Sequence, residues 1–369
     1  QARGRLLAGK EKEMKASRKP LGALALGLLL ASSGWLLAAA QQPPPSEQRQ
    51  GPIEPQTKEE KIPYALRVEV PLVDVEVTVV DKNGNFIHGL QREHFRVYLD
   101  GKEQEVVAFA PTEAPLTTVL LVEATPLVGY VLYQNVDTAY LFLQQLRKED
   151  WVALIGYDMK PRIEVDFTRN PNDILQALRQ MQYGFGRFSE ANLYDALIDT
   201  LDRLKDVEGK KSIILIGSGF DTFSQHTWDD ARRIAREQRT TIFTIGMTWL
   251  IELSLDRAEA RGYRTNTQRM DVYIAQSQLR DLAEQTGGRA YFPRFITQMP
   301  GIYQEIGAML RNQYSLAFRP KDFQRDGKFH KIEVKLVGPN GEPLKVVDQN
   351  GKKVKYEVYA RKGFYAPEA

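Results

Sequence analysis

The period of the apolar residues changes twice along the chain. From Leu66 apolar and polar residues alternate, and the phase shifts at Pro71, which indicates a strand with a break or bulge at the proline. A turn signal at Asp81-Lys82-Asn83-Gly84 and renewed alternation before Asp100-Gly101 extend this pattern. Residues 64–112 are therefore predicted to form a small antiparallel β unit.

Residues 116–318 have a different pattern, in which short, uniformly apolar runs alternate with helical stripes. Such runs are typical of strands buried on both faces, and apolar spacings of three and four place each stripe on one helix face. The runs are Val119–Val122, Val152–Ile155, Ile213–Ile216 and Ile242–Ile245. The stripes begin at Leu132, Ile174, Leu193 and Ile302. This alternation predicts an α/β fold with a doubly wound, mostly parallel sheet.

Strand-like alternation returns in residues 319–369, for example at Ile332, Val334 and Leu336. Each flanking β segment has too few strands to bury a face well by itself. We therefore expect the two segments to form one antiparallel β-sandwich, with the α/β domain inserted between them.

The first forty residues resemble a targeting segment. Basic residues follow Met14, an uncharged run extends from Leu21 to Ala40, and that run ends in three alanines, as in a secretory signal. Residues 1–13 are then interpreted as upstream sequence, and residues 41–63, rich in Gln, Pro, Glu and Lys, as a flexible tether. We expect the protein to be exported to the periplasm, the cell surface or the medium. An uncleaved leader that anchors the chain in a membrane is the alternative, because its length is just enough to span.

Composition removes several classes of function. The chain of 369 residues has a net charge of +3, but outside the first forty residues 43 Lys/Arg face 45 Asp/Glu, which does not favour nucleic-acid binding. The absence of cysteine excludes disulfides, thiolate metal sites and cysteine nucleophiles. The four histidines show no metal-ligand spacing.

Candidate functional residues lie where the predicted parallel strands end, because open α/β sheets bind ligands beyond the carboxyl ends of their strands. Glu123 and Thr125 follow the first strand, Asn192 precedes a helix, and Ser218 and Asp221 follow a central strand.

These loops and the flanking blocks resemble a von Willebrand factor type A domain. From about Leu66 to the C-terminus, the chain is similar more narrowly to the VWFA-related family described from Acidobacteria. That similarity rests on the Asp100-Gly101-Lys102 block, on Thr286-Gly287-Gly288-Arg289-Ala290 and on the ending Tyr359-Ala360-Arg361-Lys362-Gly363-Phe364-Tyr365. The resemblance implies an adhesion or protein-interaction role and, in many such domains, a metal-ion-dependent adhesion site.

Carried over residue by residue, the resemblance implies a degenerate adhesion site. The five metal-ligand positions fall on Glu123, Thr125, Leu127, Ala191 and Ser218. Leu127 and Ala191 have no side-chain oxygen, and Ser218 lacks a charge, whereas Mg²⁺ prefers six oxygen ligands. The favoured interpretation is a polar rim whose residues form hydrogen bonds with their own loops, in a domain that binds partners without metal or cofactor or does not bind at all. Its residues are Glu123, Thr125, Asn192, Ser218 and Asp221.

Two alternatives to this interpretation stay open at this point. A rebuilt site for Mg²⁺ or Ca²⁺ would need Asp221 or Glu190 as a substitute ligand. A hydrolase would need Ser218, Asp221 and His226 as a triad, although no nucleophile elbow surrounds Ser218. Without either, no residue is expected to be catalytic. The partner is then a protein or a cell-envelope component, and the oligomeric state is not indicated.

The segment between Trp249 and Asp271 contains four arginines and Tyr263. We interpret it as a solvated surface loop. The alternative is a lobe that contacts a partner, because Arg and Tyr are enriched at interfaces.

Overall fold

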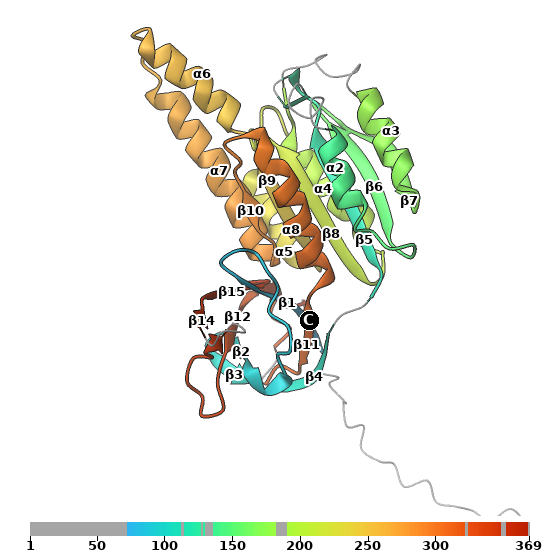
Figure 1. Ribbon diagram of the computed structural model, residues 1–369, viewed down its shortest axis with the longest axis vertical. Coiled ribbons are helices and arrows are strands. Elements are labelled where there is room, and N and C mark those ends of the chain that lie inside the picture. Colours follow the sequence, from blue (N-terminus) through green and yellow to red (C-terminus); the bar gives the residue numbers. More distant parts are fainter. Residues whose placement is uncertain are drawn as a thin grey trace, which may run out of the picture. The chain divides into compact units, whose positions relative to one another are not determined.

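The computed structural model describes residues 72–111, 114–126, 128–129, 136–181, 190–321, 324–347 and 352–367. A six-stranded sheet in the order β10-β9-β8-β5-β6-β7 forms the α/β part (Figure 1). All its pairs are parallel except β6 with β7. Its strands are β5 (Leu116–Glu123), β6 (Trp151–Tyr157), β7 (Pro161–Thr168), β8 (Lys210–Gly217), β9 (Thr240–Gly246) and β10 (Ala290–Tyr291). The predicted α/β class and mostly parallel sheet are confirmed.

Helices cover both faces of this sheet because successive residues of each strand point to opposite sides. Leu120 and Val122 of β5 pack with one group of helices, whereas Val119 and Leu121 pack with the other. The first group is α2 (Val136–Leu143), α3 (Pro171–Met181) and α8 (Met299–Arg311). The second is α4 (Leu193–Leu204), α5 (Trp228–Glu237) and α7 (Asn266–Thr286).

The two flanking β segments form a sandwich, as expected. One sheet has the order β15-β1-β11-β4 and the other β16-β12-β2-β3, and their apolar faces share one core. N-terminal strands are β1 (Val73–Asp81), β2 (Phe95–Leu99), β3 (Lys102–Gln104) and β4 (Val106–Pro111). Later strands are β11 (Tyr314–Phe318), β12 (Phe329–Leu336), β15 (Tyr356–Ala360) and β16 (Gly363–Tyr365). Strand β11 was counted with the α/β segment in the sequence, but it pairs with β1 and β4.

Short elements complete the described chain. A small hairpin pairs β13 (Val346–Val347) with β14 (Lys353–Val354), and two 3₁₀ turns are η1 (Arg92–His94) and η2 (Ile296–Gln298). The predicted leader, the tether and the break at Pro71 lie outside the described residues. No helix in the described ranges is long and apolar enough to cross a membrane.

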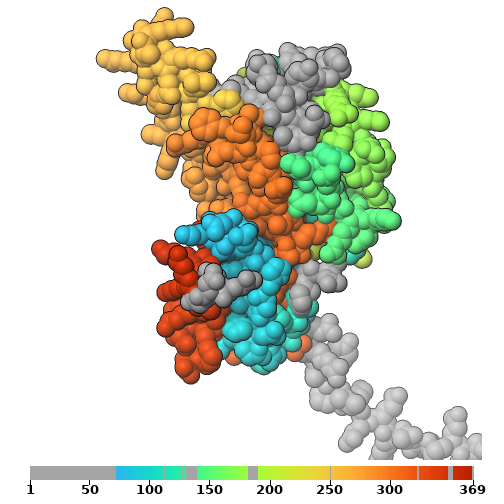
Figure 2. All heavy atoms as spheres, viewed as in Figure 1, coloured from blue at the N-terminus to red at the C-terminus, as the bar shows by residue number. Residues whose placement is uncertain are grey.

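The arginine-containing segment is a helical hairpin, so its interpretation as a loop was wrong. Helix α6 (Trp249–Ala260) turns back into the 21-residue helix α7, and both extend beyond the sheet (Figures 1 and 2). Arg269 links the two helices through Asp256 at 2.6 Å and Glu259 at 2.8 Å. We call the hairpin formed by residues 249–274 the arm.

Candidate functional site

A buried carboxylate lies where β5 ends. Glu123 is 1% exposed, and its Oε2 accepts hydrogen bonds from the backbone N–H of Ser218 at 2.6 Å and from the Ser218 hydroxyl at 2.7 Å. Its Oε1 accepts from the Thr125 hydroxyl at 2.6 Å. The side chain therefore crosslinks the ends of the neighbouring strands β5 and β8.

The surroundings of this carboxylate are tightly packed. A Cβ atom on Gly217 would lie 2.8 Å from Oε2 of Glu123 and 2.5 Å from the Tyr157 hydroxyl, so only glycine fits there. Burial raises the pKa of Glu123 above its usual range, and the hydrogen bonds from Thr125 and Ser218 oppose that shift without cancelling it. The Tyr157 hydroxyl is buried and has no aligned hydrogen-bond partner among the described residues.

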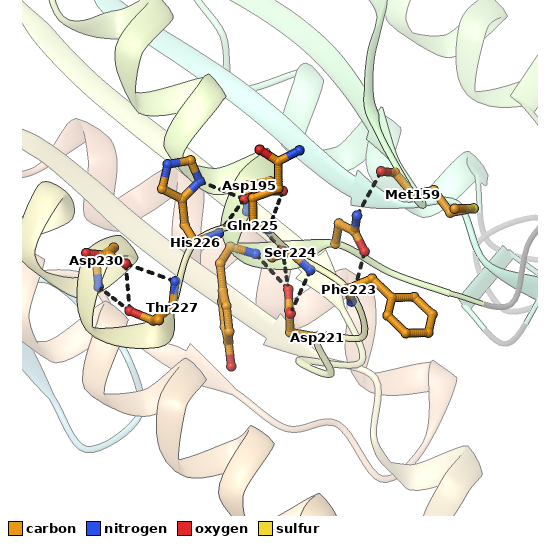
Figure 3. Close-up of polar contacts among 11 residues, drawn as sticks. Met159, Asp195, Asp221, Phe223, Ser224, Gln225, His226, Thr227 and Asp230 are labelled. Carbon is orange, nitrogen blue, oxygen red and sulfur yellow. Dashed lines mark hydrogen bonds and ion pairs between the residues drawn. The ribbon is translucent and has the colours of Figure 1, made fainter.

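A second polar cluster joins two loops through Asn192. The side-chain amide of Asn192 donates to the carbonyl oxygen of Met159 at 3.0 Å and accepts from the backbone N–H of Phe223 at 3.1 Å. Met159 follows β6 and Phe223 follows β8, so one side chain fixes the backbones of two loops at the same edge (Figure 3).

Asp221 and Asp195 fasten the β8 loop to the start of α4. Asp221 accepts from the backbone N–H of Tyr194 at 3.1 Å and from the Ser224 hydroxyl at 2.5 Å (Figure 3). Asp195 accepts from the backbone N–H of Gln225 at 2.9 Å and lies 2.7 Å from Nδ1 of His226. Burial acts to raise the pKa of Asp195, but these hydrogen bonds outweigh it and hold that pKa below its usual range. The loop after β8 is therefore held to the start of α4 by the hydrogen bonds of Asp221 and Asp195.

The structure thus divides the predicted rim into two clusters. Glu123, Thr125 and Ser218 form the buried one, whereas Asn192 and Asp221 belong to the loop cluster. No hydrogen bond joins the two clusters within the part of the chain that is described.

The residues present do not fit a magnesium site of the adhesion type. The hydroxyls of Thr125 and Ser218, which would face a cation, already donate to Glu123, and both Glu123 oxygens accept internal bonds. Ala191 is buried and has no side-chain oxygen to offer. Among the described residues, no three acidic or histidine side chains converge as metal ligands.

The triad expected for a hydrolase is not assembled. The Ser218 hydroxyl donates to Glu123, and the His226 imidazole lies beside Asp195 instead of Ser218. Asp221 caps the backbone of α4 rather than orienting a histidine.

Several residues of the site were missed in the sequence. Tyr157, Asp195 and Ser224 had no motif that singled them out, because their partners come from distant loops. Thr227 and Asp230 form a capping box at the start of α5, and the spacing Thr-x-x-Asp could have indicated it.

Comparison with known proteins agrees with this architecture. Residues 132–220 match the family model described as the von Willebrand factor type A domain. The matched segment includes β6, β7 and β8 of the six-stranded sheet, so this part of the chain is similar to a domain of this class. No curated protein sequence matches the chain.

Solved structures resemble the chain at low identity. An aerotolerance-related membrane protein from Bacteroides fragilis is 9% identical, with a TM-score of 0.39, 53% of this chain covered and 98% of that chain. BatB, a conserved hypothetical protein from Bacteroides thetaiotaomicron, is 13% identical, with a TM-score of 0.37 and coverages of 53% and 100%. The PilB minor pilin from Streptococcus sanguinis is 10% identical, with a TM-score of 0.40 and coverages of 54% and 62%. Resemblance at this level transfers no function.

Proposed function

We propose that this chain is an exported, non-enzymatic interaction module of the VWFA-related acidobacterial family, which recognises a protein or a cell-envelope component without a metal ion. The observation that carries the proposal is the Glu123 carboxylate, whose oxygens are occupied by Ser218 and Thr125. A cation in such a site would have to displace three internal hydrogen bonds. Recognition then has to use ordinary polar and apolar contacts.

Exposed apolar side chains follow three strands at the carboxyl edge of the sheet and supply a contact surface. They are Met159 after β6, Phe223 after β8 and Phe295 after β10. Phe223 is 65% exposed and Phe295 is 67% exposed, which costs hydrophobic free energy in water. Isolated exposed apolar residues are common, but three of them after strands that end at the same side of the sheet favour an interaction site.

The polar loop cluster gives this surface a fixed geometry. Asn192 holds the backbones of Met159 and Phe223 at once, and Asp221 fastens the β8 loop to α4. A preorganised surface loses less conformational entropy on binding than a flexible one does. In this proposal the rim residues position the contact residues and do not themselves contact the partner.

The arm extends the same surface, because α6 begins directly after the carboxyl end of β9. Tyr263, Met270 and Tyr273 are each more than half exposed there. Aromatic residues, Met and Arg are enriched in protein interfaces. We assign the arm to partner contact, in agreement with the alternative raised by its sequence.

Capture from cell-envelope fractions by the full chain tests the proposal. We expect the Phe223→Ser variant to capture several-fold less of a specific partner, since anchoring aromatics dominate binding energies. A chelator should leave capture by the unaltered chain unchanged. Val347→Ser is the matched control, because Val347 is 59% exposed but lies on the β13 hairpin of the C-terminal segment. Loss of capture with chelator, or full capture by Phe223→Ser, would contradict the proposal.

A further inference from the structure

A cavity of about 410 Å³ lies at the opposite, amino edge of the six-stranded sheet. Its wall includes the first residues of β8 and β9 and, across from them, residues of the sandwich strands β1 and β11. Its volume falls within the range of small-molecule sites. The cavity belongs to neither cluster of the candidate site.

Cationic side chains outnumber acidic ones around this cavity. Four of the lining residues are basic and two are acidic. The basic residues are Lys210, Lys211, Arg239 and Arg361, and the acidic ones are Asp74 and Glu76. Arg239 pairs with Asp74 at 2.9 Å, and Glu76 acts on Lys210 by charge attraction.

Helix ends explain why several of these cations are present. Lys211 donates to the carbonyl oxygen of Leu204 at 2.8 Å, and Arg361 donates to that of Arg236 at 2.8 Å. Both carbonyls belong to the last turns of helices, where the partial charge is about half a negative charge. These contacts account for the placement of Lys211 and Arg361. Lys210 donates to the carbonyl oxygen of Leu310 in the last turn of α8 at a longer distance, 3.4 Å.

The helix ends do not neutralise the cluster as a whole. Arg239 lies near enough to Lys211 and Arg361 to lower the pKa of each, after the larger effect of burial, and the pKa of Arg361 falls to about 10. Burial likewise lowers the pKa of Lys210 to about 8. Positive charges that repel one another in a partly buried wall favour an anion between them.

Two uncharged polar groups of the same wall have no hydrogen-bond partner among the described residues. The Thr240 side chain is 2% exposed, and its hydroxyl makes no hydrogen bond among the described residues. The side-chain oxygen of Gln238 is buried without a partner as well, and an amide flip would turn its NH₂ group to the same place. Buried polar groups usually have partners, so these two indicate a missing ligand or water.

We propose that this cavity binds a small phosphate compound, whose oxyanion is held by Arg239, Lys210 and the Thr240 hydroxyl. A tetrahedral oxyanion accepts several charged hydrogen bonds from different directions, which Lys210 at the start of β8 and Arg239 just before β9 can provide. The apolar wall formed by Leu116, Ala235 and Leu310 faces any organic group attached to the phosphate.

Calorimetric titration of the full chain tests this site with two probes, inorganic phosphate and glycerol phosphate. A parallel titration with sodium chloride at equal ionic strength is the control for the screening of surface charges by salt. We expect glycerol phosphate to bind and to raise the melting temperature. If inorganic phosphate binds more tightly than glycerol phosphate, the ligand of the cavity is the free phosphate ion and not a phosphate ester.

Two variants decide whether binding occurs in this cavity. Arg239→Gln is expected to weaken binding about tenfold, the effect of losing one charged hydrogen bond, and Thr240→Val should weaken it less. The matched control is Arg233→Gln, since Arg233 pairs with Glu237 on an exposed part of α5 and does not line the cavity. Absence of heat and of a melting shift with both probes, or equal weakening by Arg233→Gln, would overturn the proposal.

Discussion

The two edges of the six-stranded sheet treat buried charge in opposite ways. At the carboxyl edge, the buried carboxyl group of Glu123 accepts three internal hydrogen bonds and links β5 to β8. At the amino edge, Lys211, Arg239 and Arg361 lie close enough to oppose one another's charge. The Glu123 oxygens at the carboxyl edge are therefore occupied by the protein's own donors, whereas the amino edge retains donors for an external anion.

This difference distinguishes polar groups that stabilise the fold from polar groups that remain free to bind a ligand. A residue that falls on a motif position of a known fold does not reveal whether its oxygen faces a ligand or a neighbouring strand, because both uses need the same residue type. The hydrogen-bond partners of the side chain show which of the two uses applies. At Glu123 all of them are internal, so its contribution should appear in folding stability.

Removing the buried carboxylate should have the largest effect. Glu123→Ala leaves the Ser218 N–H and the hydroxyls of Ser218 and Thr125 buried without their acceptor. We expect the free energy of unfolding to fall by about 3 kcal/mol, since each unsatisfied buried group costs about 1–3 kcal/mol. Urea unfolding at neutral pH measures this loss.

Glu190→Ala is the control for that substitution. Glu190 is only partly buried and makes no ion pair among the described residues, so its replacement should change the free energy of unfolding by no more than about 0.5 kcal/mol. Equal effects of the two substitutions would mean that the Glu123 crosslink does not stabilise the fold.

A smaller loss is expected at the loop cluster. Asn192→Ala removes the bonds to Met159 and Phe223, which should lower the free energy of unfolding by about 1–2 kcal/mol. Amide exchange should become faster in residues 158–160 and 220–224, measured by mass spectrometry. Asn172→Ala, at an exposed position in α3, is the control. Unchanged exchange in both loops would show that Asn192 does not hold them.

The smallest expected effect is a change in pH dependence. Because burial raises the folded-state pKa of Glu123, at a pH between the unfolded and the folded pKa the folded protein holds a proton that the unfolded chain has already lost. The stability that this group contributes is therefore full below its unfolded pKa and declines as the pH rises through the folded pKa. Glu123→Gln removes this titration. The stability difference between the unaltered chain and the variant should fall with rising pH, and a difference that rises would contradict the shift.

The main elements could be predicted because their signals are local. The apolar run Val119–Val122 is buried on both faces of the sheet, and the Asn170-Pro171 start of α3 is found where the sequence placed it. Strand β7 was missed because it is the outermost strand of the sheet and none of its residues is fully buried. The segment between Trp249 and Asp271 was interpreted as a loop because it contains many charged residues, whereas the buried apolar positions of α7, which include Val272, Ala275 and Leu279, follow it.

The candidate site was only half predictable. Its five rim residues were identified from their places after strands and before a helix, but their partners depend on three-dimensional proximity. Glu123 and Ser218 are 95 residues apart, and no local pattern shows that one accepts from the other. Nor could the sequence show that Asn192 holds two loops, since the two bonds are to backbone groups.

Melting of the full chain with and without millimolar Mg²⁺, at equal ionic strength, tests the central claim most directly. With the Glu123 oxygens occupied by Ser218 and Thr125, we predict the same melting temperature in both conditions. A rise with Mg²⁺ would contradict the claim and show that this end of the sheet binds a cation. Loss of that rise in Glu190→Ala, or in Asp221→Asn, which keeps a side-chain oxygen for its internal bonds, would identify the substitute ligand.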